Sequence, residues 1–241
     1  MKNRWMVLPL LLPISAAMAQ DNSGLSKEQI AAKLNGVEAS HVGDSPVQGV
    51  YEVAIGSNVA YVTTDGRYLL QGELYDLQTN ENLTELTRSS ARVDVLADVD
   101  PDTMLVFSPE ASQVKHTITI FTDVDCGYCR QFHREIDQVN ALGIRVNYLS
   151  YPRTGPDTES WFKAERVWCA DDRNDALTRA KAGGEMPDEA ACGTNPVAMH
   201  FELGHQVGVR GTPAIYSANG DWLGGYLPPQ ALLERLDELS E

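Results

Sequence analysis

Hydrophobic and polar positions in the first hundred residues predict a helix, a meander of strands and a second helix. Ser26 and Gln29 have the spacing of a helix-capping box at the start of the first apolar periodicity. Between residues 47 and 77 apolar positions alternate with polar ones, and Asp65-Gly66 supplies a hairpin signal. Residues 83–100 return to helical spacing without a glycine, so a helix is expected there rather than a flexible linker.

These patterns divide the N-terminal part into a small domain over residues 20–82 and a helical linker over residues 83–105. The small domain contains no cysteine, so neither a disulfide nor a second sheet is available to support its core. Self-association would supply the missing burial, and docking on the rest of the chain is an equally good alternative.

Residues 106–241 combine strands and helices in a different order. An apolar run at residues 117–121 is followed by a helix and by a second apolar run at residues 144–149. Helical spacing dominates an insert over about residues 155–207, and two short strands joined by Asn219-Gly220 precede a final helix. The fold class expected is α+β or α/β, in the order β-α-β, helical insert, β-β-α.

Composition and charge narrow the possible functions. The 241 residues are 43% hydrophobic and 22% charged, which is typical of a globular protein with packed cores. A formal charge of −15 repels nucleic-acid phosphates and anionic membrane surfaces, so nucleic acid is not expected as a partner.

The first residues have the anatomy of a secretory signal peptide. Lys2 and Arg4 precede a short apolar stretch, and small residues precede a cleavage site near Ala19-Gln20. We therefore expect residues 1–19 to be removed on export. A membrane anchor is the alternative, which the short stretch and its prolines disfavour.

Four cysteines remain after the leader, and an even number in an oxidising compartment invites disulfides, for which three pairings are possible. Cys126 and Cys129 form a CxxC motif at a predicted strand-to-helix junction. Unpaired N–H groups and the helix dipole at this position stabilise a thiolate at Cys126 and lower its pKa. Cys129, about one helical turn inward, would attack a mixed disulfide formed at Cys126.

Other uses of this motif fit less well. Zinc would need a second CxxC or paired histidines, and c-type haem attachment would need a histidine where Arg130 stands. A purely structural disulfide would close too short a loop to stabilise much. Redox exchange by the cysteine pair requires no bound cofactor, and we expect none.

Separated motifs give the chain a resemblance to a known family. The element order, the CxxC and the late Thr212-Pro213 are similar to the thioredoxin fold, and nearly the whole chain resembles the DsbC-type periplasmic disulfide isomerases. The segments that carry this resemblance are Phe121-Thr122-Asp123, Cys126-Gly127-Tyr128-Cys129, Asn140-Ala141-Leu142-Gly143-Ile144, Tyr151-Pro152-Arg153, Trp168-Cys169-Ala170, Gly211-Thr212-Pro213-Ala214, and Gly225-Tyr226 with Pro228-Pro229.

The resemblance implies roles for individual residues. Cys126 would be the attacking thiolate and Cys129 the resolving thiol, while Cys169 and Cys192 would form a structural disulfide. Substrate would be bound beside the sulfurs by Gly127, Tyr128, Thr212 and Pro213, with the Pro213 peptide bond cis.

The resemblance also implies partners. Residues 20–82 would form a homodimer, and residues 106–241 would be the catalytic domain. Substrates would be misfolded disulfide-containing proteins of the periplasm, and a membrane reductase of the DsbD type would keep the motif reduced.

Three positions near the motif are considered individually. Asp125 stands where the family commonly has an uncharged residue, and its carboxylate would either raise the pKa of Cys126 or cap the following helix. His133 is expected to be a solvated helix residue. Ile120 occupies the position of a thioredoxin carboxylate, which argues against a thioredoxin-like reductase.

The sequence therefore predicts a periplasmic protein disulfide isomerase with chaperone activity. A thiol oxidase or a reductase of selected cysteines on the same fold is an alternative, because the direction of exchange depends on a reduction potential. A dimeric holdase chaperone is another.

Overall fold

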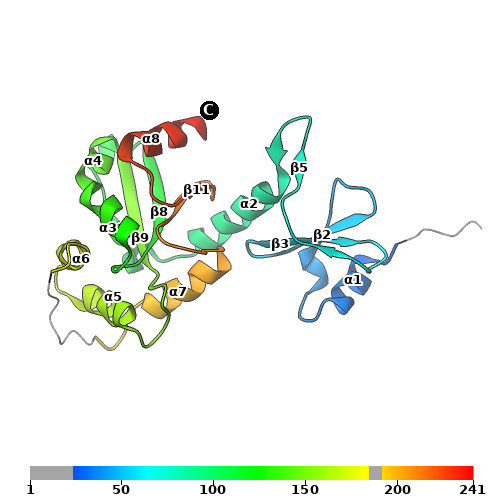
Figure 1. Cartoon of the computed structure of the whole chain (residues 1–241), viewed down its shortest axis with the longest axis horizontal. Helices are drawn as coiled ribbons and strands as arrows, with labels where there is room; N and C mark the ends of the chain where they lie inside the picture. The colour runs from blue at the N-terminus through cyan, green and yellow to red at the C-terminus, as the bar shows by residue number, and fades with distance from the viewer. Residues whose placement is uncertain (1–23, 185–191, 241) are drawn as a thin grey trace, which may run out of the picture.

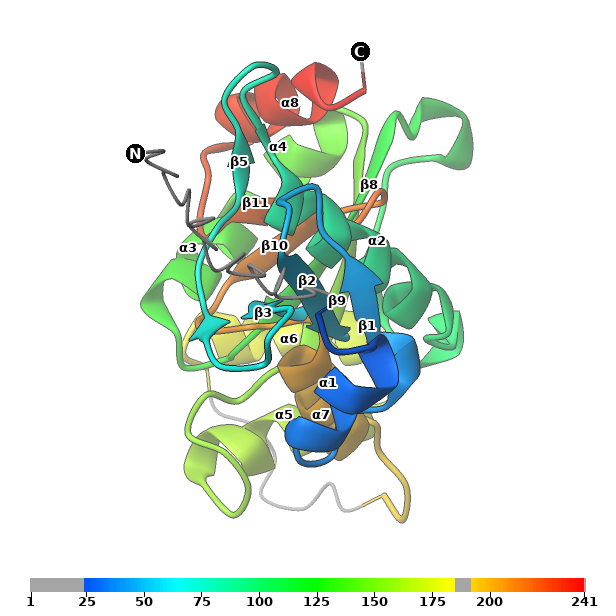
Figure 2. The same cartoon turned by 90° about the vertical axis from the view of Figure 1, so that its right-hand side faces the viewer.

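The structure, a computed structural model, describes residues 24–184 and 192–240 (Figure 1). The expected signal peptide, residues 1–19, lies outside the described residues. A small N-terminal unit occupies one end of the molecule, and helix α2 (Leu83–Ala97) runs from it to a larger C-terminal unit. Figure 2 views the molecule from the end that carries the N-terminal unit. In the part of the chain that the structure describes, no helix has the length and apolarity to cross a membrane.

The N-terminal unit is a short helix on an antiparallel sheet with the strand order β1-β2-β3-β4. Its elements are α1 (Lys27–Lys33), the 3-10 turn η1 (Ala39–His41), β1 (Val42–Asp44), β2 (Val50–Ile55), β3 (Asn58–Thr63), β4 (Leu69–Leu70), β5 (Tyr75–Asp76) and β6 (Glu81–Asn82).

The helix and most of the strands of this unit lie where the sequence predicts them. Ser26 and Gln29 form the full capping box at the start of α1, and Ile30 on the inner face of α1 is completely buried against Val42 and Val53. The last part of the expected meander, residues 68–77, does not form one strand, because β5 pairs with β6 rather than continuing the main sheet. Strand β1 was not predicted, since only one of its three residues is a large apolar one.

The C-terminal unit is built on a five-stranded mixed sheet with the order β11-β10-β8-β9-β7. Strands β8 and β9 are parallel and the other neighbours are antiparallel. Its elements are η2 (Pro101–Thr103), β7 (Leu105–Phe107), η3 (Ala111–Gln113), β8 (His116–Thr122), α3 (Gly127–Arg134), α4 (Ile136–Ala141), β9 (Ile144–Ser150), α5 (Glu159–Cys169), α6 (Arg173–Lys181), α7 (Val197–Gln206), β10 (Ala214–Ser217), β11 (Trp222–Gly224) and α8 (Pro229–Glu238).

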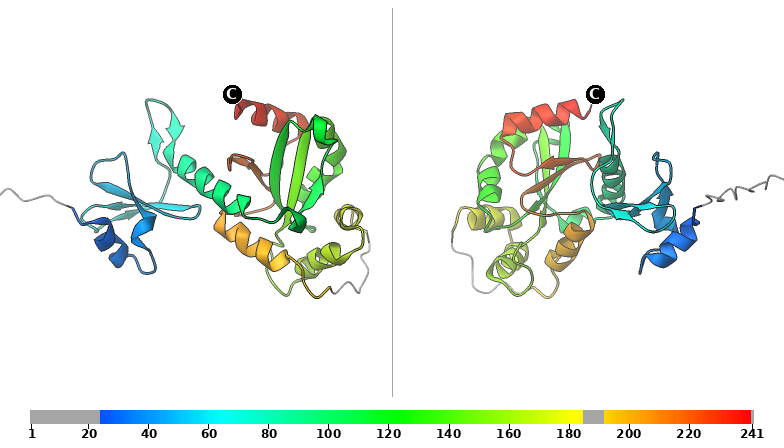
Figure 3. Two further views of the ribbon diagram at one scale, coloured as in Figure 1. Left: turned by 180° about the vertical axis from the view of Figure 1, so that it is seen from behind. Right: turned by 45° about the vertical axis from the view of Figure 1, so that its right-hand side comes forward.

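Both faces of this sheet are covered, as the two views of Figure 3 show. On one face, Ile118 and Ile120 of β8 pack with residues of α3, α4, α6 and α8. On the other, Phe121 packs with residues from the end of α2 and from α7. Side chains that point alternately to the two faces of β8 therefore contribute to two separate cores. The end of β8 leads directly into the turn that carries the CxxC motif.

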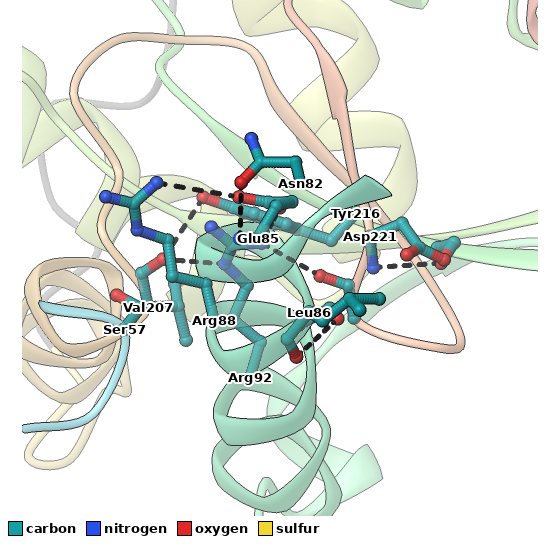
Figure 4. Close-up of polar contacts among 12 residues, drawn as sticks. Ser57, Asn82, Glu85, Leu86, Arg88, Arg92, Val207, Tyr216 and Asp221 are labelled. Atoms are coloured by element: carbon teal, nitrogen blue, oxygen red, sulfur yellow. Dashed lines mark hydrogen bonds and ion pairs between the residues drawn. The ribbon is translucent and has the colours of Figure 1, made fainter. Parts of the chain in front are cut away.

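The connector helix is fixed to the C-terminal unit by Arg92, which is 6% exposed (Figure 4). Its Nε donates to the carbonyl of Val207 at 3.2 Å, and its Nη1 donates to the carbonyl of Gly220 at 3.1 Å and pairs with Glu85. The guanidinium also lies 5.2 Å from the centre of the Tyr216 ring. These contacts hold the C-terminal half of α2 as part of the larger unit.

A second contact joins the N-terminal unit to helix α7. Ser57, in the turn between β2 and β3, donates from its hydroxyl to the carbonyl of Gln206 at 2.8 Å and from its backbone N–H to the same carbonyl at 3.2 Å. A Cβ on Gly208 would lie 2.8 Å from the Ser57 hydroxyl, so the close approach of the two segments requires glycine there.

Candidate active site

The two CxxC cysteines lie where strand β8 gives way to helix α3. Cys126 is the N-cap residue of α3, and Cys129 lies within the first turn. Both are free thiols and both are buried, with Cys126 2% and Cys129 1% exposed. The strand and helix thus hold both sulfurs at the edge of the core.

The segment of Thr212 and Pro213 lies directly against the first cysteine. The Cys126 Sγ is 3.1 Å from the Thr212 carbonyl oxygen, and the Thr212–Pro213 peptide bond is cis. The Thr212 hydroxyl oxygen is buried and has no hydrogen-bond partner among the described residues. The Thr212 side chain helps to lower the pKa of Cys126.

The pKa values of the two thiols are shifted in opposite directions. Hydrogen bonding from Cys129 lowers the pKa of Cys126 to about 5, against the opposing effect of burial, with further help from Thr212 and the charge of Arg153. Burial raises the pKa of Cys129, and its hydrogen bond to Cys126 raises it further. At neutral pH, Cys126 is therefore a thiolate and Cys129 a protonated thiol.

Asp123 holds the turn before Cys126 in place. Its carboxylate is 2% exposed and accepts hydrogen bonds from the Ser160 hydroxyl at 2.6 Å and from the backbone N–H groups of Asp125 and Arg153 at 2.8 and 3.0 Å. The Arg153 guanidinium lies 3.1 Å away. Burial alone would raise the pKa of Asp123, but these hydrogen bonds lower it, so a charged carboxylate joins three segments around the site.

Asp125 does not cap helix α3, so the capping expectation is wrong. Its carboxylate instead pairs with Arg130 Nη2 at 2.8 Å and Lys163 Nζ at 3.1 Å, and the N-cap position has no side-chain hydrogen bond. The reason is that cations from α3 and α5 reach the carboxylate from the side. Its negative charge remains adjacent to Cys126.

Replacing Asp125 with threonine is expected to lower the pKa of Cys126, because the thiolate loses a neighbouring negative charge while Arg130 and Lys163 remain. Thiolate absorbance of the reduced protein against pH measures this pKa. Asp137→Thr, on the exposed surface of α4, is the control and should leave it unchanged. An unaltered pKa in Asp125→Thr would discard the idea.

The other substrate residues expected from the sequence surround the sulfurs on the open side. Tyr128 is 64% exposed and stacks on Tyr226 with ring centres 6.3 Å apart. A Cβ built on Gly127 meets no atom within 4 Å, so the space beside the motif is free. Thr212 and Pro213 also line a cavity of about 590 Å³ that extends between the two units past Trp222.

Cys169 and Cys192 are joined by a disulfide, with their Cα atoms 5.4 Å apart. The bridge ties the end of α5 to the segment before α7 and leaves the CxxC pair free. The expected helical insert, about residues 155–207, contains α5, α6 and α7, and its residues 185–191 lie outside the described part.

Lys181 was not predicted as a site residue, and its side chain lies in the core next to Thr122. Lys181 is 3% exposed, and its Nζ donates to the Thr122 hydroxyl at 2.7 Å. A signal was present, because the spacing of the apolar residues Ala176, Leu177 and Ala180 places position 181 on the buried face of α6.

His133 was expected to be solvated, and this expectation is wrong. It is 4% exposed and hydrogen-bonded through Nδ1 to the Tyr148 hydroxyl and through Nε2 to the Thr178 hydroxyl. Helix α6 and strand β9 enclose it, and burial lowers its pKa to about 3. Within the described ranges, no group of three or more histidine, cysteine or acidic side chains is arranged to hold a metal ion.

Comparison with family models divides the chain in the same way as its structure. Residues 15–85 match the model described as the disulfide bond isomerase protein N-terminal domain, and residues 110–240 match a thioredoxin-like domain. The expected fold class, a small antiparallel domain and a helical linker before a thioredoxin-like domain, is thereby confirmed.

Relatives match over nearly their whole length. The thiol:disulfide interchange protein DsbC of Escherichia coli (strain K12) is 36% identical over 99% of this chain and 97% of its own. DsbC of Dickeya dadantii (strain 3937) is 38% identical over 98% and 96%.

Solved structures resemble the larger unit. A disulfide interchange protein from Neisseria gonorrhoeae is 28% identical with a TM-score of 0.51, covering 58% of this chain and 97% of that one. The catalytic domain of Proteus mirabilis ScsC, at 19% identity and a TM-score of 0.51 over 65% of this chain and 99% of that one, shares the fold.

Proposed function

Because the chain belongs to the DsbC family of thiol:disulfide interchange proteins, we propose that it is a protein disulfide isomerase that attacks non-native disulfides through Cys126. The observation that carries the proposal is the contrast between a Cys126 thiol whose pKa is lowered to about 5 and a buried Cys129 whose pKa is raised. The Cys126 sulfur is a thiolate that can attack a disulfide, whereas the Cys129 sulfur stays protonated until a mixed disulfide has to be resolved.

The exchange begins when the Cys126 thiolate attacks a substrate disulfide. A bond forms between Cys126 and one substrate sulfur, the substrate S–S bond breaks, and the second substrate sulfur leaves as a thiolate. If a substrate thiolate then displaces Cys126 to form another pair, the enzyme thiolate is restored and no net electrons are transferred. This outcome is isomerisation.

Cys129 provides a second outcome. It attacks the Cys126 sulfur of the mixed disulfide, and the substrate leaves as a thiolate while a Cys126–Cys129 disulfide forms. The substrate gains two electrons and the enzyme loses two. A reductase of the DsbD type, acting on the pair, would restore the dithiol.

Substrate would be held by Gly127, Tyr128, Thr212 and Pro213. The exposed Tyr128 ring and the open space beside Gly127 support this assignment. The cavity lined by Thr212, Pro213 and Trp222 offers room for an extended chain next to the Thr212 carbonyl, which lies 3.1 Å from the Cys126 sulfur. Misfolded disulfide-containing proteins are therefore the proposed substrates, and binding them at this surface would also give chaperone activity.

The proposed location is the periplasm, after removal of residues 1–19. Residues 20–82 would form a homodimer, joined by the linker of residues 83–105 to the catalytic domain of residues 106–241. Two observations support dimerisation: the N-terminal unit has a small core, and its β4 edge strand carries Leu69 and Leu70, each about half exposed.

Recovery of a substrate with scrambled disulfides tests this function, together with the reduction potential of the Cys126 and Cys129 pair. Cys126→Ala is expected to lose recovery completely, because the attacking sulfur is gone. Cys129→Ala retains the attacking sulfur and is the matched control. It should accumulate mixed disulfides with substrate, visible after acid quenching.

The results separate the alternatives. Lost recovery with retained suppression of aggregation in Cys126→Ala supports an isomerase that is also a chaperone. Unchanged recovery in that variant would overturn the proposal in favour of a holdase. Net oxidation of reduced substrates without rearrangement of wrong pairs would favour a thiol oxidase.

A further inference from the structure

A buried lysine is hydrogen-bonded to Thr122, at the end of strand β8, and its charge acts on the resolving cysteine. The Nζ atom of Lys181, in the last turn of α6, donates to the Thr122 hydroxyl at 2.7 Å and contacts the carbonyl oxygen of Asp123 at 3.4 Å. It also lies 5.7 Å from the centre of the Tyr148 ring. A lysine 3% exposed is costly unless it is neutral or paired, and neither of its two hydrogen-bond acceptors is a carboxylate oxygen.

Several ionisable groups face this ammonium from the surrounding elements. Cys126 and Cys129, at the start of α3, and Asp123, in the preceding turn, favour its charged form, whereas Arg130 of α3 opposes it. Burial is the largest effect, and it lowers the pKa of Lys181 to about 8. A lysine with this pKa can exchange a proton near neutral pH.

The other titratable groups packed here are poorly placed to accept a proton from Cys129. Both ring nitrogens of His133 are engaged, by Tyr148 and by Thr178. The Asp123 carboxylate is directed at Ser160 and Arg153. Position 120, on strand β8, is a completely buried isoleucine and offers no proton-accepting group.

Thr122 connects Lys181 to the sulfur. Its hydroxyl accepts from Lys181, and hydrogen bonding from the same side chain is among the influences that favour the Cys129 thiolate. The charge of Lys181 is another such influence. Thr122 is itself 5% exposed, so a chain from the Cys129 sulfur through the Thr122 hydroxyl to the Lys181 nitrogen is shielded from water.

We propose that Lys181 is the proton acceptor for Cys129 during resolution of the mixed disulfide, reached through the Thr122 hydroxyl. The inference rests on the proposed function, since it assigns Cys129 the resolving role. Lys181 does not touch the reacting sulfurs, and it acts by setting the protonation state of Cys129.

The proton and electrons balance as follows. The Cys129 S–H proton passes to the Thr122 oxygen as the Thr122 proton passes to neutral Lys181. The Cys129 sulfur then bonds to Cys126, and the substrate sulfur leaves with the electron pair of the broken bond. The proton on Lys181 is subsequently lost to the departing thiolate or to water.

The charge of Cys126 would determine at which stage of the reaction Lys181 accepts the proton. In the resting enzyme the Cys126 thiolate favours protonated Lys181, which in turn stabilises negative charge at the motif. In the mixed disulfide Cys126 carries no charge, so the pKa of Lys181 falls further and the amine becomes available as a base. Lys181 therefore accepts a proton at the stage when Cys129 must lose one.

The test uses an aromatic disulfide whose released thiolate absorbs visible light, added in excess to the full reduced protein. The first thiolate released reports attack by Cys126, and the second, at a rate independent of reagent concentration, reports attack by Cys129. Lys181→Met removes the amine but keeps an unbranched chain in the core. Thr122→Val removes the connecting hydroxyl at nearly constant shape.

In both variants the second release is expected to slow on the order of 10- to 100-fold at neutral pH, which is at or below the lower limit of general-base effects. Its rate should then rise with pH without the inflection that Lys181 gives the wild type. Lys181→Arg, which keeps the charge but cannot release a proton, should be slow too. Arg179→Met, on the exposed face of the same helix, should match the wild type.

Each contrary result is informative. An unchanged second release in Lys181→Met, or full recovery in Lys181→Arg, would overturn the role as proton acceptor. A slowing that is equal at every pH would indicate displaced packing and would also overturn it. A first release no faster than that of an ordinary thiol would instead contradict the proposed function.

Discussion

The reduced protein is expected to become more stable than its Cys126→Ala variant by ~1.4 kcal/mol for each pH unit between about 5 and the pKa of an unfolded cysteine. The folded pKa of Cys126 is lowered, so the folded state holds the thiolate where the unfolded chain still binds a proton. This stabilisation is fully present above the unfolded pKa of about 8.5 and is lost as the pH falls through the folded pKa.

Urea unfolding of the reduced wild type and of Cys126→Ala across this range measures the effect. The difference between the two proteins is the relevant quantity, because Asp123 and the other carboxylates titrate in both. With this slope, the difference in the free energy of unfolding should grow to roughly a few kcal/mol by mildly alkaline pH. A flat difference would show that Cys126 is an ordinary thiol.

Replacing Arg92 with leucine is expected to lower the free energy of unfolding by about 3 kcal/mol. The guanidinium donates to the carbonyls of Val207 and Gly220 and pairs with Glu85 (Figure 4), and Arg92 is buried. Leucine fills part of the space but leaves both carbonyl groups without their donor, and the ion pair is lost. Chemical denaturation at fixed pH measures the loss.

Arg88, one turn earlier on helix α2, is the matched control. Its side chain is 16% exposed and pairs with Glu73, which is 38% exposed, and at 3.8 Å with Glu85. Arg88→Leu should therefore cost only about 1 kcal/mol or less. Equal losses of unfolding free energy in the two variants would mean that the contacts of Arg92 with the C-terminal unit do not stabilise the protein more than a surface ion pair does.

Features fixed by neighbouring residues could be predicted from the sequence. The capping box at Ser26, the meander and the strand that leads into Cys126 all depend on signals within a few residues. The CxxC pair was also evident, because its chemistry requires a helix start and a spacing of one turn. These signals gave the fold class and the two sulfurs.

The remainder of the site depends on contacts between distant segments. Asp123 binds Ser160, which is 37 residues away, and Lys181 reaches Thr122 across 59 positions. The sequence suggests that a lysine near the end of a helix and a histidine such as His133 are solvated. The packing of α6 against α3 and β9 buries both. Asp125 likewise finds its partner Lys163 on another helix.

The disulfide between Cys169 and Cys192 also determines what a break in the backbone would do. A single cut by a protease anywhere among residues 170–191 would produce two fragments that remain joined through sulfur. One fragment would carry β7, β8 and β9 and the other β10 and β11, which belong to the same sheet. The nicked molecule would run as one species on a gel until reductant released its halves.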